Sequence, residues 1–123
     1  MNITVISVGK IKEKYFTAAI DEYSKRLSRF AKLNIIEVAD EKIPDNASEK
    51  EMEQIKEKEG NKILAKLPQN SFVVTLCIEG KEHSSEELAK KIADISMTSS
   101  HITFIIGGSL GLSNTVKSKS ALR

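Results

Sequence analysis

Tryptophan is absent from this sequence, aromatic residues make up only 5% of it, and cysteine occurs once. The core must therefore be built from Ile, Leu, Val and Ala side chains. The lone Cys77 excludes a disulfide within the chain and lies in an apolar run, where a buried thiol is expected. One cysteine and two histidines at unrelated positions do not form the ligand set of a usual metal site, so no metal is expected.

Long apolar runs and a strong charge imbalance are also lacking. No stretch approaches the roughly 18 consecutive apolar residues of a membrane helix, so no membrane partner is expected. The apolar run 3–8 is too short and too polar for a signal peptide, which favours a cytoplasmic protein. A net charge of +2 is compatible with an RNA partner, but there is no basic stripe of the kind that binds nucleic acid unaided.

What is present is an alternation of short β-branched runs and longer amphipathic segments. Strands are expected over residues 3–8, 33–38, 72–78 and 102–106. Helices are expected over 13–31 and 48–67, after Ser84 or Ser85, and after Ser113. A chain of 123 residues forms one domain, so we predict a single α/β domain, 1–123, with a mostly parallel sheet and helices on both faces.

The two long helices carry different signals. Residues 13–31 place apolar side chains at helical spacing, which predicts a stripe that covers one face of the sheet. Ser48 and Glu51 form a capping box that starts the second helix. Its Glu-Lys cluster, 49–59, is typical of a solvated face, and Gly60 is an unfavourable residue inside a helix. The chain ends at 121–123, where a fifth strand is expected.

Two glycine turns follow the last two strands. Residues 102–106 run into Gly107-Gly108-Ser109-Leu110-Gly111, and residues 72–78 run into Gly80. If these strands are neighbours, both turns face one crevice at the carboxyl edge of the sheet, where α/β proteins bind ligands. The alternative is a tight turn without a ligand. No P-loop, Rossmann or nucleophile-elbow motif is present, and catalysis by His83 is a minor alternative to an incidental surface histidine.

Several segments together resemble one family. They are Val8-Gly9-Lys10-Ile11-Lys12-Glu13-Lys14-Tyr15, Ile35-Ile36-Glu37-Val38 with Asp40-Glu41-Lys42, Lys56-Glu57-Lys58-Glu59-Gly60, and the run from Phe104 to Leu112. They look like the RlmH family of rRNA methyltransferases, which belongs to the SPOUT, or α/β-knot, class. The similarity covers residues 1 to about 120.

The resemblance implies a homodimer that uses S-adenosylmethionine to methylate N3 of a pseudouridine in 23S rRNA of the assembled 70S ribosome. It places the cofactor against loops of a trefoil knot, at positions that correspond here to Leu76 and Gly80 in one loop and to Ile106, Gly107, Gly108 and Ser109 in another. The family continues beyond residue 123 with a strand, a third cofactor loop and a helix, so the domain is expected to be incomplete at its C-terminus and to lack the knot-forming segment. No residue is a candidate for removing the N3 proton, and the catalytic residues stay unknown.

Two other functions stay open at this point. One is a non-catalytic ribosome- or RNA-binding module, or a truncated inactive form, with the same fold. The other is an α/β domain that binds a nucleotide or another small ligand. Affinity for S-adenosylmethionine would support the methyltransferase. Affinity for ribosomes alone would support the RNA-binding module, and affinity for free nucleotides would support the small-ligand domain.

Overall fold

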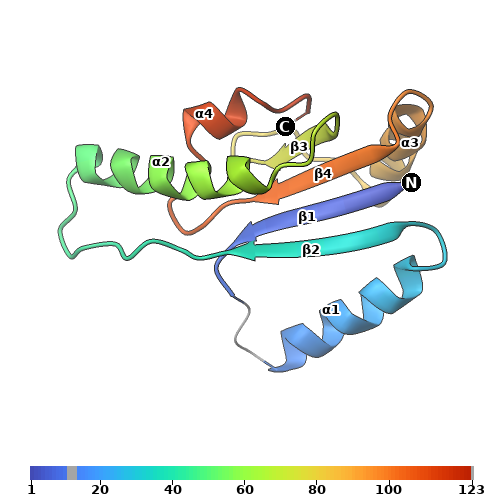
Figure 1. Cartoon of the computed structure of the whole chain (residues 1–123), viewed down its shortest axis with the longest axis horizontal. Coiled ribbons are helices and arrows are strands. Elements are labelled where there is room, and N and C mark those ends of the chain that lie inside the picture. Colours follow the sequence, from blue (N-terminus) through green and yellow to red (C-terminus); the bar gives the residue numbers. More distant parts are fainter. Residues whose placement is uncertain (11–13, 123) are drawn as a thin grey trace.

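The computed structural model describes residues 1–10 and 14–122 of the chain, in which strands and helices alternate as the sequence predicts (Figure 1). Residues 11–13 of the charged connector after the first strand lie outside the described residues. The elements are β1 (Asn2–Val8), α1 (Lys14–Leu27), β2 (Lys32–Val38), α2 (Glu49–Lys66), β3 (Phe72–Leu76), α3 (Ser85–Ser96), β4 (His101–Ile106) and α4 (Asn114–Lys117).

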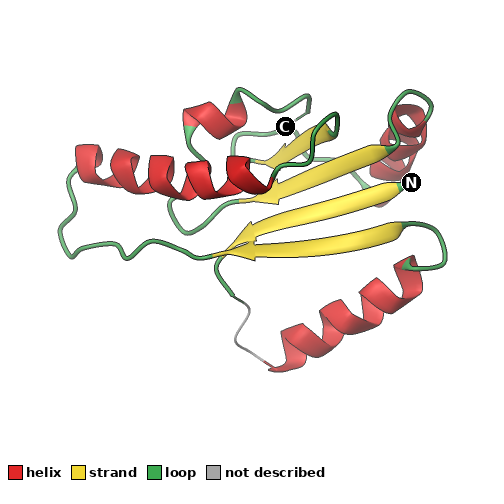
Figure 2. Cartoon of the chain, viewed as in Figure 1, coloured by secondary structure: helices red, strands yellow, loops and turns green. Residues whose placement is uncertain are grey.

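The four strands form one parallel sheet in the order β2-β1-β4-β3 (Figure 2). The first and last strands therefore pair at the centre, with Ile6 opposite Ile105. β3 and β4 are neighbours, and Leu76 is paired with Ile106 at their carboxyl ends. This confirms the parallel sheet and brings the two predicted glycine turns to the same edge.

One face of the sheet holds the hydrophobic core, covered by α2 and α4. Alternate residues of each strand point to this face, as the period of two requires. The core is aliphatic, as the scarcity of aromatic residues predicts; its buried members are Ile6, Val38, Ile63, Val73, Ile105, Leu112 and Val116.

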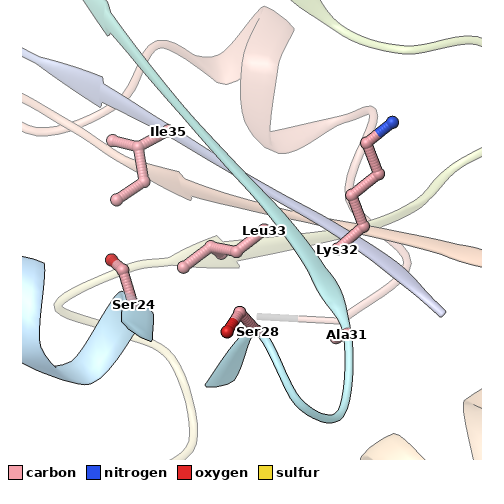
Figure 3. Close-up of a pocket in the computed structure, with 6 residues that line it drawn as sticks. All are labelled: Ser24, Ser28, Ala31, Lys32, Leu33 and Ile35. Atoms are coloured by element: carbon pink, nitrogen blue, oxygen red, sulfur yellow. The ribbon is translucent and has the colours of Figure 1, made fainter. Parts of the chain in front are cut away.

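On the opposite face, α1 does not cover the sheet in the way the sequence predicts. Most of its large apolar side chains are exposed, from 43% for Leu27 and 52% for Phe16 to 63% for Tyr23, while Ile20 is half-buried near Ile35 of β2. The side of α1 that faces β2 is instead rich in small polar groups, and a cavity of about 520 Å³ separates them. Figure 3 shows Ser24 of α1, and Ser28 in the turn after it, opposite the strand that carries Leu33 and Ile35. The prediction that this stripe packs on the sheet is wrong for the single chain.

The helix starts follow the predicted serines. Ser48 accepts a hydrogen bond from the Glu51 N–H at 3.1 Å, and the Glu51 carboxylate accepts one from the Ser48 N–H, which confirms the capping box. Ser84, rather than Ser85, caps α3 in the same way with Glu87. Ser113 caps α4 and is itself buried.

Gly60 of α2 marks a close approach of two helices. A Cβ at this position would lie 2.7 Å from Ser113 Oγ and 3.0 Å from Val116 Cγ2. Because Ser113 Oγ is held by the Val116 N–H at 3.3 Å, the cap cannot move aside freely. Glycine therefore allows α4 to lie against α2, a helix–helix contact rather than the helix–sheet contact or kink that the sequence left open.

Gly60→Ala is expected to lower the free energy of unfolding by about 1–2 kcal/mol, because overpacking outweighs the gain of about 1 kcal/mol in helix propensity. Thermal unfolding measures this effect. Asn61→Ala, at the exposed neighbouring position, is the matched control and should be neutral or slightly stabilising. Equal stabilisation by both substitutions would contradict the packing explanation.

The last described residues run alongside β3. The Thr75 N–H donates to the Leu122 oxygen at 3.0 Å, and the Ala121 N–H donates to the Val73 oxygen at 2.8 Å. Val74 and Leu122 form an isolated parallel bridge. Residues 121–122 thus lie where the sequence predicts a further strand, at the outer edge of β3.

Candidate functional site

A pocket of about 270 Å³ opens at the carboxyl ends of β3 and β4. It collects five of the six predicted cofactor-binding residues, which are Leu76, Ile106, Gly107, Gly108 and Ser109. Gly80 does not line it. The Gly80 N–H instead donates to the Cys77 oxygen at 3.0 Å and closes the turn that follows β3.

The pocket follows directly from the register of the two strands. Leu76 and Ile106 are paired neighbours, and both side chains are substantially exposed although they end buried strands. Together with Ile78 and Leu110 they give the pocket apolar walls, while the turn from Gly107 to Gly111 contributes backbone N–H and C=O groups. Apolar walls with a few fixed polar groups are typical of a small-molecule site.

The glycines of this turn lie close to other parts of the protein. In the structure, a Cβ on Gly107 would lie 3.0 Å from the Gly111 carbonyl carbon and from Leu112 Cδ2. A Cβ on Gly108 would lie 3.2 Å from Val8 Cγ1 and from Glu59 Oε1. A side chain at either glycine would therefore crowd the protein itself, and in this turn a positive φ of +85° occurs at Gly111.

An ion pair at the rim joins two elements that are far apart in the sequence. Lys117 Nζ of α4 lies 2.6 Å from Glu79 Oε1 in the turn after β3. Lys56 of α2 also lines the pocket, and its ammonium lies 2.8 Å from Glu53 Oε1. Lys117 and Glu79 were not predicted as site residues, because nothing local in the sequence links them.

Glu59 lies beneath the glycine turn, at the inner side of α2. Its side chain is 5% exposed, so the prediction that the cluster 49–59 is wholly a solvated face is wrong at its last residue. Glu59 Oε2 accepts a hydrogen bond from the Glu41 N–H at 2.9 Å. Lys62, one turn further along α2, donates to the Ala39 oxygen at 3.1 Å and pairs with Glu41 Oε1 at 2.9 Å. The Lys62 ammonium, through this hydrogen bond and its charge, lowers the pKa of the Glu41 carboxyl.

His83 and the tyrosines lie away from this pocket. His83 lines a separate cavity of about 230 Å³ that it shares with Cys77, Lys81 and Leu88. Within the described residues its ring nitrogens have no hydrogen-bond partner, and Nδ1 lies 3.8 Å from Glu87 Oε2. Cys77 is partly buried and donates from Sγ to Thr75 Oγ1 at 3.3 Å. Tyr15 and Tyr23 are exposed on α1.

Residues 1–10 and 14–122 contain no group of three His, Cys, Asp or Glu side chains placed to hold a metal ion. None of their helices is long and apolar enough to cross a membrane.

Comparison with known proteins gives a consistent result. The family model described as "Predicted SPOUT methyltransferase" matches residues 1–123. A protein of Clostridium botulinum (strain Hall), named ribosomal RNA large subunit methyltransferase H, is 62% identical over 120 residues, which are 97% of this chain and 76% of the relative. The Clostridium tetani protein of the same name is 60% identical over 121 residues, 98% of this chain and 76% of the relative. Ribosomal RNA large subunit methyltransferase H 1 of Clostridium perfringens (strain SM101) is 62% identical over 117 residues, 94% of this chain and 74% of the relative.

Proposed function

Because the chain belongs to the SPOUT methyltransferase family, and within it to the ribosomal RNA large subunit methyltransferase H group, we propose that it methylates N3 of a pseudouridine in 23S rRNA of the assembled 70S ribosome, with S-adenosylmethionine as the methyl donor. Methyl transfer to rRNA follows from the relationship itself. The identity of the methyl donor, of the modified nucleobase and of the ribosomal substrate goes beyond this relationship and is proposed here.

The observation that carries the proposal is the pocket between the ends of β3 and β4. Its apolar walls, Leu76 and Ile106, suit a flat adenine ring, and the backbone of Gly107 to Ser109 offers hydrogen bonds to the polar parts of a nucleoside. Bound S-adenosylmethionine supplies an electrophilic methyl group on a positively charged sulfur. The role of the chain's own residues is to hold this group in a fixed orientation and to keep water from it. Gly80 supports the pocket by closing the turn after β3.

A homodimer is part of the same proposal. α1 presents Phe16, Tyr23 and Leu27 to solvent on one side, and Phe30, just beyond its end, is 80% exposed. An apolar stripe of this kind on a protein surface marks an interface. A second copy with the same stripe covers it symmetrically, in the manner of most soluble homo-oligomers. A protein that acts on ribosomes works in the cytoplasm, so this location is proposed too.

Calorimetric titration of S-adenosylmethionine into the purified 123-residue protein tests the cofactor assignment. We expect saturable binding of one molecule per chain, since the two loops form the pocket within each protomer. A second assay measures transfer of labelled methyl groups to 70S ribosomes that lack the modification, followed by mass spectrometry of the 23S rRNA fragment that carries the label. Binding to ribosomes without affinity for S-adenosylmethionine would support a non-catalytic RNA-binding module instead. Affinity for free nucleotides alone would support a nucleotide-binding domain.

A further inference from the structure

The buried carboxylate of Glu59 lies directly behind the turn from Gly107 to Gly111. The proposed reaction assigns no role to this carboxylate. Glu59 is 5% exposed, and a Cβ on Gly108 would approach its two carboxylate oxygens at 3.2 and 3.5 Å. Gly108 lines the pocket and Glu59 does not, so the backbone of the turn separates the carboxylate from the pocket. The carboxylate is also held from the other side, by the Glu41 N–H at 2.9 Å.

Within the described residues, three lysines of α2 and α4 pair with carboxylates other than Glu59. Lys62 pairs with Glu41 at 2.9 Å, Lys56 with Glu53 at 2.8 Å, and Lys117 with Glu79 at 2.6 Å. The hydrogen bond to Glu59 comes from a neutral peptide group. Burying a carboxylate without a paired cation is unfavourable, whereas a glutamine accepts the same peptide hydrogen bond at lower cost. Among residues 1–10 and 14–122, neither an ion pair nor the peptide hydrogen bond thus accounts for a negative charge at Glu59.

The methyl donor offers the missing positive charge. The sulfur of S-adenosylmethionine is a sulfonium cation. When its methyl carbon bonds to the nucleophile, the electron pair of the broken C–S bond stays on sulfur, and the product S-adenosylhomocysteine is a neutral thioether. A fixed negative charge close to this pocket stabilises the donor and not the product, since interactions between charges are strong where water is excluded.

We propose that Glu59 is a specificity-determining residue that makes the pocket favour the cationic methyl donor over the neutral product. Glu59 also supports the position of Gly108, because its carboxylate lies against the turn after β4 and is held by a hydrogen bond from the loop after β2. This inference rests on the proposed cofactor. The two roles separate experimentally, since charge acts only on cationic ligands and position acts on every ligand of the pocket.

Glu59→Gln and Glu59→Ala are titrated by calorimetry with S-adenosylmethionine, with S-adenosylhomocysteine, and with sinefungin, in which a protonated amine replaces the methylsulfonium. For Glu59→Gln we expect the Kd of the two cationic ligands to rise about fivefold, and that of the neutral product to change less than about twofold. Glu59→Ala also removes the acceptor for the Glu41 N–H. It is therefore expected to weaken the binding of all three ligands and to lower the unfolding temperature.

Glu49→Gln is the matched control, because Glu49 is an exposed carboxylate in the first turn of the same helix. It should leave all three affinities unchanged. An equal loss for cationic and neutral ligands in Glu59→Gln, or no loss for either, would overturn the charge-selecting role. Failure of the unsubstituted protein to bind any of the three would instead refute the proposed cofactor, and this inference with it.

Discussion

Gly108→Val is expected to weaken S-adenosylmethionine binding by more than about tenfold and to lower the free energy of unfolding by about 1–3 kcal/mol. Gly108 lies between two fixed neighbours, and its Cβ would be 3.2 Å from both Val8 Cγ1 and Glu59 Oε1. A lone Cβ at this distance requires a shift of a few tenths of an ångström, whereas the two methyl groups of valine require the turn to leave its position. The turn forms one wall of the pocket, so the ligand site moves with it.

Calorimetry and thermal unfolding of Gly108→Val and Gly108→Ala test this reasoning together. Alanine should cost less than valine in both measurements, because it adds only the first atom. A side chain that merely fills the crevice would block the ligand and leave the unfolding temperature unchanged, so loss of both properties distinguishes packing from filling. Unchanged affinity in Gly108→Val would refute the pocket assignment.

Leu27→Glu is expected to raise the dissociation constant of the homodimer by about 100-fold or more, because an unpaired charge would be buried at the centre of the interface. Leu27 is 43% exposed in the single chain, so the substitution should leave the fold of the protomer intact. The other apolar residues of the stripe, Phe16 and Tyr23, lie on the same side of α1, at helical spacing from it.

Sedimentation velocity over a concentration series measures the association. Ala18→Glu is the matched control: it introduces the same side chain at an exposed position of α1, about 180° around the helix from Leu27 at about 100° per residue. The control should dimerise like the unsubstituted protein. A dimer that persists in Leu27→Glu, or an unsubstituted protein that stays a monodisperse monomer, would contradict the proposed interface.

Local signals in the sequence predicted the elements and the place of the pocket. β-branched runs marked the strands, and the serine caps gave the helix starts, because capping and alternation are decided within a few residues. β3 is shorter than predicted and ends at Leu76, since Cys77 and Ile78 turn into the pocket rim. The sequence left open whether β3 and β4 are neighbours. The structure shows that they pair in parallel, with Leu76 opposite Ile106.

What the sequence did not predict depends on contacts between distant elements. Glu59 belongs to a Glu-Lys cluster that is solvated at most of its positions, and only the turn after β4 and the loop after β2 bury it. The ion pair of Lys117 and Glu79 needs α4 and the β3 turn to meet. The stripe of α1 was read correctly as apolar, but periodicity does not state what covers it. In the single chain most of its side chains are exposed to solvent.

The central pairing of β1 with β4 also has a consequence for the order of folding. Asn2 lies opposite His101 in the register of the two strands. The central pair of the sheet therefore joins residues that are separated by most of the length of the chain. During synthesis β1 can pair with β2 as soon as β2 has left the ribosome. The other edge of β1 stays unpaired until β4 has also been synthesised. Contacts of such long sequence separation slow folding. Gly107 follows β4 directly. The ligand pocket therefore forms only when β4 pairs with β1 and β3, which is a late step of folding.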